Sequence, residues 1–489
     1  MLLERSDVNP DGADGLIRTP LLLAAKSGHE GIVGRLLKQR GINPDRADEL
    51  SRTPLLWAAK NGHQGVVKRL LERGGVNPDK ADKQSRTALM LATESGHEGV
   101  VGMLLARSDV NPNTTDTLYG RTPLLWAAAN GHEGIVRILL ERSDVSPGKA
   151  DKWSRTPLML AAGGGHQRVV GMLLGRSDVN PDKADELGRT PLLWAAENGH
   201  EGIVRILLER RDVNPNTTDI LYGRTPLLWA AGNGHEGIVR ILLERNDVNP
   251  NTADTLYGRT LLLWAIESGH EGIVRMLLER SDVDPDTADT EDGRTPLMLA
   301  AERGHEGVVG MLLERNDVAP DTADTECGRT PLLWAAESGH EGVVWMLLER
   351  STVNPDTPDT LYGQTPLLLA AENGHEGIVR MLLERDDVNP DTADTEYGRT
   401  PLLWATVNGH EGVVRALLER NDVTPDKADK WGRTPLLLAP ENEPEKITGL
   451  LSQPTDLIPT HEAYPQLAEL SSSEESGISK PPSKRARRF

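Results

Sequence analysis

Residues 188–210 read Gly-Arg-Thr-Pro-Leu-Leu-Trp-Ala-Ala-Glu-Asn-Gly-His-Glu-Gly-Ile-Val-Arg-Ile-Leu-Leu-Glu-Arg, and this stretch decides the fold. Thr190 is a good N-cap and Pro191 suits the first helical position, where no amide hydrogen is needed, so a short helix is expected from Pro191. Gly199 should end it, and a second helix should begin near Glu201. The residues expected on its buried face, at helical spacing, are Ile203, Val204, Leu207 and Leu208. Two such short helices cannot bury a core alone, so the segment needs neighbours of the same kind.

The same pattern recurs along most of the chain. Twelve of the thirteen histidines stand in Gly-His-Glu or Gly-His-Gln, 34 or 35 residues apart: His29, His63, His97, His132, His166, His200, His235, His270, His305, His340, His375 and His410. Arg-Thr-Pro-Leu or a close variant recurs thirteen times, from Thr19 to Thr434. A loop rich in Asp, Asn, Pro and Thr, called a finger below, joins one unit to the next. Stacked units of this kind predict a solenoid.

The units resemble the ankyrin repeat, whose family pattern runs Thr-Pro-Leu-His-x-Ala-Ala, then Gly-His, then an apolar helix ending in Leu-Leu. The resemblance implies an all-α solenoid of helix-turn-helix units with projecting finger loops, and it is specific because it recurs in register a dozen times. The usual His after Thr-Pro-Leu is Leu or Met in every unit, and the fingers are longer than the 33-residue family pattern implies.

The repeat pattern divides the chain into four parts. A partial repeat and its finger occupy residues 1–17, twelve repeats occupy 18–433, and a degenerate capping repeat occupies 434–451. Residues 452–489 form a tail rich in Pro, Ser and Glu, which is expected to be disordered.

Residues 1–8 repeat residues 276–283, the second half of an internal unit. The chain therefore begins inside a repeat, and we expect further repeats or another domain before Met1 in the natural protein. Long arrays of near-identical units are similar to the repeat arms of fungal intracellular immune-type sensors that carry a nucleotide-binding domain upstream.

Composition excludes several classes of protein. The 489 residues carry a formal charge of −20 and contain one Cys, so a disulfide framework and a multi-cysteine zinc site are excluded and an intracellular setting, cytoplasmic or nuclear, is expected. No secretory signal or membrane span is found. The acidic excess disfavours nucleic-acid binding. The tail nevertheless ends in a basic cluster that resembles a nuclear-import signal; the alternative is a solvated tail. Its residues are Lys484, Arg485, Arg487 and Arg488.

Catalytic and metal sites are not expected. Phosphate-binding loops, nucleophile elbows and Cys-His pairs are lacking, which predicts a protein that is not an enzyme and needs no cofactor or metal. The repeated His is predicted to make a structural hydrogen bond beside the loop between the two helices. Each finger also carries an Asp, in a ladder that runs from Asp14 to Asp429. Pairing with the neighbouring Arg is favoured over acid/base chemistry because a regular ladder gives every carboxylate the same surroundings.

A row of tryptophans is the most informative feature. Seven units carry Trp four residues after the capping Thr: Trp57, Trp126, Trp194, Trp229, Trp264, Trp334 and Trp404. On a helix, Trp194 lies away from the stripe of Leu192 and Ala195 and shares a face with Glu197. Either the tryptophans anchor a protein in the concave groove that the family resemblance implies, or each indole lies flat and mostly buried across the neighbouring helix. The predicted groove residues include Glu197, Glu267 and Glu337, at a position that varies between units.

These observations predict a non-enzymatic scaffold that binds one or more partner proteins in the groove of the solenoid. Two alternatives remain open: the recognition arm of a larger nucleotide-binding immune-type sensor, and a nuclear adaptor directed by the basic tail. The sequence specifies neither the partner nor the oligomeric state.

Overall fold

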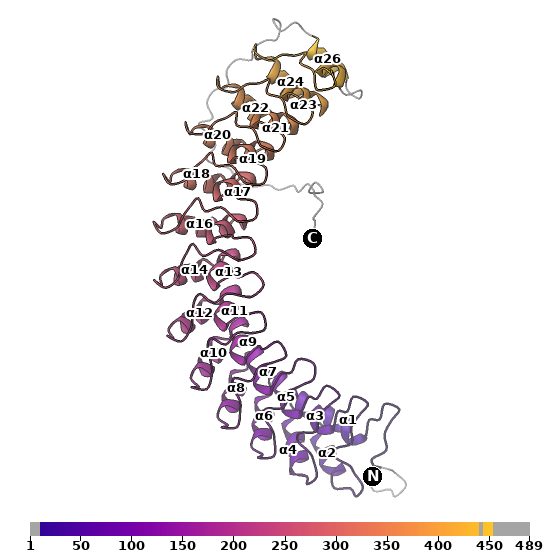
Figure 1. Cartoon of the computed structure of the whole chain (residues 1–489). Helices are drawn as coiled ribbons and strands as arrows, with labels where there is room; N and C mark the ends of the chain where they lie inside the picture. The colour runs from indigo at the N-terminus through magenta and orange to yellow at the C-terminus, as the bar shows by residue number, and fades with distance from the viewer. Residues whose placement is uncertain (1–9, 440–443, 453–489) are drawn as a thin grey trace, which may run out of the picture. The chain divides into compact units, whose positions relative to one another are not determined.

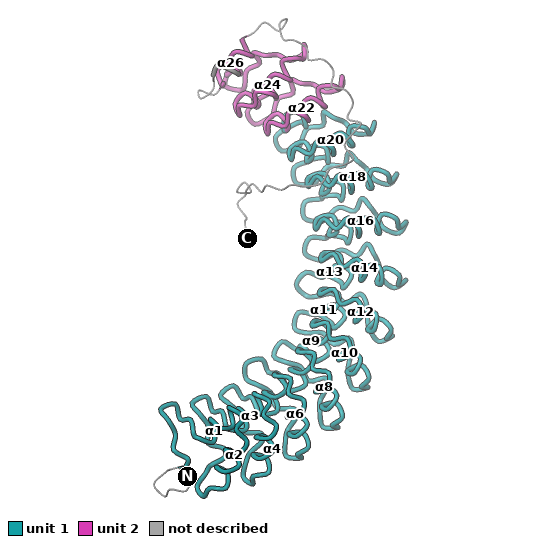
Figure 2. Tube along the Cα trace, turned by 180° about the vertical axis from the view of Figure 1, so that it is seen from behind, with its two compact units in different colours: residues 1–369 teal, residues 370–489 magenta. Residues whose placement is uncertain are grey.

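The computed structural model describes residues 10–439 and 444–452. Within these residues the chain forms 26 α-helices and no strand (Figure 1). It divides into two compact units, with the boundary after Leu369, inside helix α21 (Figure 2). The repeated octapeptide at residues 1–8 and the basic cluster of the tail lie outside the described residues.

The helices alternate between a first and a second helix of each repeat. Those of the first unit are α1 (Pro20–Lys26), α2 (Glu30–Leu36), α3 (Pro54–Lys60), α4 (Gln64–Glu72), α5 (Ala88–Glu94), α6 (Glu98–Leu105), α7 (Pro123–Ala129), α8 (Glu133–Leu140), α9 (Pro157–Gly163), α10 (Gln167–Leu174), α11 (Pro191–Glu197), α12 (Glu201–Leu208), α13 (Pro226–Gly232), α14 (Glu236–Leu243), α15 (Leu261–Glu267), α16 (Glu271–Leu278), α17 (Pro296–Arg303), α18 (Glu306–Leu313), α19 (Pro331–Ser338) and α20 (Glu341–Leu348). Then follow α21 (Pro366–Asn373), α22 (Glu376–Leu383), α23 (Pro401–Val407), α24 (Glu411–Leu418), α25 (Pro435–Leu438) and α26 (Pro444–Leu451).

Local capping chemistry sets the helix ends. The amide of Leu193 donates a 3.3 Å hydrogen bond to Oγ1 of Thr190, and Pro191 opens α11, so the predicted cap is confirmed. Gly199, at a φ of +78°, turns the chain between α11 and α12, a conformation that favours glycine. The Thr cap recurs at the first helices, and only at Thr434 is its side-chain hydrogen bond lacking among those described.

Each of the two compact units is built of two layers of helices. In the first unit α11 packs on α9 and α13, and α12 packs on α10 and α14, so first helices stack on first helices and second helices on second helices. Figure 2 shows the first-helix layer on the inner side of the curve that this unit follows. The core lies between the layers. Its members from α11, fully enclosed by neighbouring repeats, are Leu192, Leu193, Ala195 and Ala196.

The second helix differs from its predicted pattern at one position. Ile203, Val204 and Leu207 are buried as expected, but Leu208 is half-buried because it lies at the end of α12, where the chain turns into the finger. The expectation that Leu208 belongs to the buried face is therefore wrong in part.

Arginine side chains at the ends of second helices link neighbouring repeats. Arg210 donates from Nη1 to the carbonyl of Leu174, at the end of the preceding second helix (3.2 Å), and from Nε and Nη2 to Asp212 (2.9 and 2.8 Å). A cation at a helix C-terminus satisfies carbonyl groups that have no partner inside the helix. The same reach to a preceding carbonyl is made by Arg107, Arg142, Arg176, Arg245, Arg280, Arg315 and Arg420. These bonds stiffen the stack from one repeat to the next.

Helix α25 is the shortest first helix, with four residues, and leaves Leu436 and Leu437 exposed. Among the described residues, none of the helices combines the length and the apolar character that a membrane crossing requires.

Candidate functional site

Each tryptophan of the row is hydrogen-bonded to the finger that precedes its helix. The indole Nε1 donates to Oδ2 of the finger Asp nine or ten residues earlier, at 2.8–3.1 Å. The pairs are Trp57 and Asp48, Trp126 and Asp116, Trp194 and Asp185, Trp229 and Asp219, Trp264 and Asp254, Trp334 and Asp324, and Trp404 and Asp394. The nitrogen of every indole in the row is therefore engaged within the chain, and only ring atoms are left to contact a partner.

The rings are partly covered rather than fully exposed. Six of the seven tryptophans are half-buried, and Trp334 is buried, with 4% of its surface exposed. Guanidinium groups stack on them: Arg189 lies 3.9 Å from the ring centre of Trp194, and Arg224 lies 3.8 Å from that of Trp264. Such cation–π contacts are favourable and fix both partners. The geometry thus includes features of both interpretations of the row, because an indole that is packed and bonded still presents part of its ring.

The finger Asp closes the finger on itself. Oδ1 of Asp116 accepts from the amide of Tyr119 (2.6 Å), and Oδ2 accepts from the amide of Arg121 (3.0 Å). These local bonds define an Asx-type turn. Sequence reasoning anticipated Asp–Arg pairing but missed both this turn and the bond to Trp. The signal was the narrow range of spacings, four or five residues from Asp to Arg and nine or ten from Asp to Trp.

The second partner of the Asp depends on the repeat. Where Leu replaces Trp and the finger is short, the Arg that precedes the cap binds the Asp, as Arg155 binds Oδ2 of Asp151 from Nε (2.9 Å) and Nη2 (2.8 Å). In two repeats with Leu and a longer finger, Oδ2 of Asp289 and Oδ2 of Asp359 are buried without a hydrogen bond. The predicted Asp–Arg pairing is confirmed within the short fingers of the repeats with Leu and, as ion pairs of 3.6–3.7 Å, between neighbouring fingers. The assumption that all the carboxylates share the same surroundings is wrong.

The three predicted groove glutamates lie beside the tryptophans and pair with the Arg eight residues earlier. Glu267 Oε2 lies 2.5 Å from Nη1 of Arg259, and Glu337 Oε2 lies 2.7 Å from Nη1 of Arg329. The corresponding distance from Glu197 to Arg189 is 3.6 Å. Burial raises the pKa of the Glu197 carboxyl. The structure therefore brings Trp, Asp, Arg and Glu together on one half-buried surface of the first-helix layer, which we call the groove face.

The repeated histidines have a structural role. Nε2 of His200 lies 3.0 Å from the carbonyl oxygen of Gly163, at the end of the first helix of the preceding repeat. The equivalent contact, at 3.0–3.4 Å, is made by His63, His97, His132, His166, His235, His270, His340 and His410. The structural hydrogen bond predicted from the sequence is confirmed, and it joins two repeats. In the described part of the chain, His, Cys, Asp and Glu side chains form no cluster able to hold a metal.

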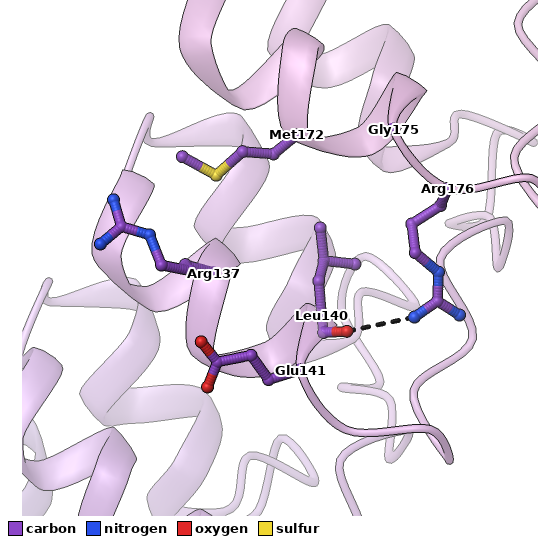
Figure 3. Close-up of a pocket in the computed structure, with 6 residues that line it drawn as sticks. All are labelled: Arg137, Leu140, Glu141, Met172, Gly175 and Arg176. Carbon is purple, nitrogen blue, oxygen red and sulfur yellow. Dashed lines mark hydrogen bonds between the residues drawn. The ribbon is translucent and has the colours of Figure 1, made fainter.

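The second-helix layer carries a shallow depression of about 290 Å³ between α8 and α10. It is lined by Arg137, Leu140, Glu141, Met172, Gly175 and Arg176 (Figure 3). Nη1 of Arg176 donates a hydrogen bond to the carbonyl oxygen of Leu140 (3.1 Å). The lining holds no histidine and no Ser, Thr, Cys or Lys side chain, and its one carboxylate is that of Glu141.

A two-layer helical solenoid with a polar network repeated on its groove face belongs to the class of repeat proteins that present a long surface to other molecules. The chain belongs to the ankyrin-repeat family. The family model described as ankyrin repeats in three copies matches residues 1–82, 74–151, 143–219, 211–289, 281–359, 351–426 and 391–459, nearly the whole chain. The repeats form a protein-interaction domain. Comparison with curated proteins gave no match.

Proposed function

We propose that the chain is a non-enzymatic scaffold that binds partner proteins on the groove face. The observation that carries the proposal is a contrast between two sets of positions in the first helices: the core positions are constant, and the positions on the groove face vary. The core Leu and Ala of each first helix hardly change, whereas the residue after Ala-Ala is Lys26, Lys60, Glu94, Ala129, Gly163, Glu197, Gly232, Glu267, Glu302 and Glu337 along the first unit. Packing fixes the core Leu and Ala residues. The variable residues are free to differ, as expected of a surface that recognises a partner.

Charge and covered aromatic surface support this assignment. The groove face combines half-buried indole rings with guanidinium and carboxylate groups that differ between repeats. Aromatic and Arg side chains are the residues that most often dominate binding energy at interfaces. We further propose that the protein acts inside the cell and uses no cofactor, metal or nucleic acid.

A matched pair of charge reversals tests the groove. Glu197→Arg with Glu267→Arg changes the groove face. Glu209→Arg with Glu279→Arg makes the same change of charge at exposed positions that follow the second helices α12 and α16. Partner capture by the full chain should fall about tenfold for the first pair, since the reversal breaks two Arg–Glu pairs and changes the charge pattern that the groove face presents, and should be retained by the second. Equal capture by both pairs would contradict the proposal.

The nuclear-adaptor alternative rests on the basic cluster in residues 484–488. Deletion of this cluster from a fluorescently tagged chain should move the protein out of the nucleus; an unchanged distribution would refute this role. The recognition-arm alternative stays a prediction from the sequence.

A further inference from the structure

The groove face contains a repeated site at which a guanidinium receives a carboxylate. In five repeats of the first unit, the residue eight positions after the Arg is Glu, and its Oε2 approaches Nη1 of that Arg. The pairs are Arg86 with Glu94, Arg189 with Glu197, Arg259 with Glu267, Arg294 with Glu302 and Arg329 with Glu337, at 2.5–3.6 Å. These five repeats show that the site accepts a carboxylate and that the carboxylate approaches the guanidinium on its Nη1 side.

Five repeats of the same unit have the Arg without the Glu, among them those of Arg121 and Arg224. Arg121 is followed eight residues later by Ala129, and Arg224 by Gly232. Neither guanidinium makes a hydrogen bond in the described part of the chain. The buried Nε of each lacks one, as it also does in Arg189 and Arg259, which have the Glu, so the difference lies at Nη1. Burial lowers the pKa of the Arg121 guanidinium. In the repeats with Glu, Nη1 has a carboxylate beside it, and a ligand carboxylate would supply the same charge-assisted hydrogen bond to Arg121 and Arg224.

The carboxylates that form ion pairs with Arg121 and Arg224 are too far away for a hydrogen bond. Nε of Arg121 lies 3.7 Å from Oδ2 of Asp151, and Nε of Arg224 lies 3.7 Å from Oδ2 of Asp254. Both Asp oxygens are already engaged, that of Asp254 by Trp264 and that of Asp151 by Arg155. The chain itself therefore leaves the Nη1 side of each guanidinium open.

The Arg224 site is held rigid by three aromatic rings. Its guanidinium carbon lies 3.8 Å from the ring centre of Trp264, 4.7 Å from that of Tyr222 and 4.9 Å from that of Trp229. Only 14% of the Arg224 side chain is exposed. A guanidinium fixed in this way loses little side-chain entropy when it binds a ligand. Even a single hydrogen bond to it therefore contributes more to the affinity for that ligand. Arg121 is flanked by Tyr119 and Trp126, at 5.2 and 4.7 Å.

Two of the other three repeats of the first unit without Glu do not offer this site, because Arg18 and Arg155 are hydrogen-bonded to Asp14 and Asp151. In the third repeat, the position that Glu holds in the sister repeats carries Lys60, a second cation beside Arg52, so this repeat does not present a guanidinium alone.

We propose that Arg224 and Arg121 are receptor sites for two carboxylate side chains, Asp or Glu, of one partner segment. The proposal deepens the groove function and rests on it. The partner carboxylate would occupy the place of Glu267 Oε2 in its own repeat and form a charge-assisted hydrogen bond to Nη1.

The spacing of the sites sets the form of the partner. Arg121 and Arg224 are three repeats apart, about 24–30 Å at 8–10 Å per stacked helix. An extended segment covers that span in about 7–9 residues. The net charge of −20 selects against a densely acidic segment, so the partner presents two isolated carboxylates rather than an acidic run.

The sister repeats also supply variants that close the sites. A Cβ built at Gly232 meets no atom nearer than Cε3 of Trp264, at 4.0 Å, so Gly232→Glu fits. Gly232→Glu with Ala129→Glu would restore the Arg–Glu pair of the neighbouring repeats and block both receptors without disturbing the fold. Gly232→Gln with Ala129→Gln has nearly the same shape without the charge and is the matched control.

The probe is a fluorescent Gly-Ser peptide with two Glu residues eight positions apart, titrated by anisotropy against the full chain. We expect it to bind about tenfold more tightly than the same peptide with Gln, about tenfold less tightly to the Glu variant, and nearly unchanged to the Gln variant. Equal binding of the Glu and Gln peptides, absence of saturable binding, or unchanged binding to the Glu variant would overturn the inference. Tighter binding of a phosphoserine peptide would replace carboxylate by phosphate and overturn it too.

Failure of this inference is distinguishable from failure of the groove proposal. If partner capture is lost in Glu197→Arg with Glu267→Arg but persists in Gly232→Glu with Ala129→Glu, the groove binds its partner without the two receptors, and only the carboxylate inference fails.

Discussion

The indole nitrogen of Trp264 donates a 2.9 Å hydrogen bond to Oδ2 of Asp254, ten residues earlier in the same repeat. This bond ties the first helix to the finger that precedes it, and it recurs at every tryptophan of the row. The tryptophans therefore have a structural task whether or not they also contact a partner, and replacing them affects folding as well as binding.

Trp264→Phe should weaken its repeat. Phe keeps an aromatic ring for Arg224 but lacks the N–H, so a buried Asp254 oxygen loses its donor, at a cost of about 1–3 kcal/mol. Long repeat arrays do not unfold in one step, so amide hydrogen exchange over residues 254–266 is the measurement. The control is Trp153→Phe at an exposed fingertip, where we expect less than about 0.5 kcal/mol. Equal effects of the two substitutions would refute the role of the bond.

Leu299→Trp should stabilise its repeat. Oδ2 of Asp289 is buried without a hydrogen bond, and Leu299 stands ten residues later, as Trp264 does after Asp254. An indole there would supply the missing donor, with a gain of about 0.5–1.5 kcal/mol. Leu160→Trp is the matched control, because Arg155 already occupies Oδ2 of Asp151. Hydrogen exchange near each substitution measures the difference, and a gain at both positions would mean that ring packing, not the bond, is responsible.

Asp79→Asn should stabilise the array at neutral pH. Oδ2 of Asp79 accepts from the amide of Asn111 (2.9 Å), but Oδ1 is buried without a partner. At the equivalent position Asn113 uses both groups: its Oδ1 accepts from Ser146, and its Nδ2 donates to the carbonyl of Asp144. An amide at position 79 should likewise gain a hydrogen bond worth about 1 kcal/mol.

The benefit of Asp79→Asn should depend on pH. Burial raises the pKa of the Asp79 carboxyl above its ordinary 3.8, so the folded state holds this proton more tightly than the unfolded state. The stability that the protonated Asp79 carboxyl contributes is present at low pH. It is lost as the pH rises through the raised pKa of this carboxyl in the folded state. The advantage of the variant in thermal unfolding should therefore shrink between about pH 7 and pH 4. Asp212→Asn is the contrasting control, because the hydrogen bond from Arg210 lowers the pKa of Asp212. A pH-independent advantage at Asp79 would contradict the assignment.

The sequence predicted what is local to one repeat. The cap at Thr190, the turn at Gly199 and the start of α12 follow from the residues beside them, and the structure has all three. The sequence predicted that His200 makes a structural hydrogen bond. It did not predict that the partner, the carbonyl of Gly163, belongs to the preceding repeat.

What the sequence left open depends on neighbouring repeats. A helical wheel places Trp194 on the exposed face of an isolated helix, but Arg189 and the finger Asp cover it in the stack. The stack also buries Leu193, which lies outside the apolar stripe of the wheel. The open receptors at Arg121 and Arg224 become visible only when the repeats are compared in three dimensions.

The most direct test of the groove function is a pair of site-specific photo-cross-linking residues in the full chain. One replaces Glu197 on the groove face, and the other replaces Glu209, exposed just after α12. The two sites lie in the same repeat and both side chains are carboxylates, so background capture is matched. We predict that the partner cross-links at position 197 and not at position 209. Cross-linking at position 209 alone, or equally at both positions, would contradict the account.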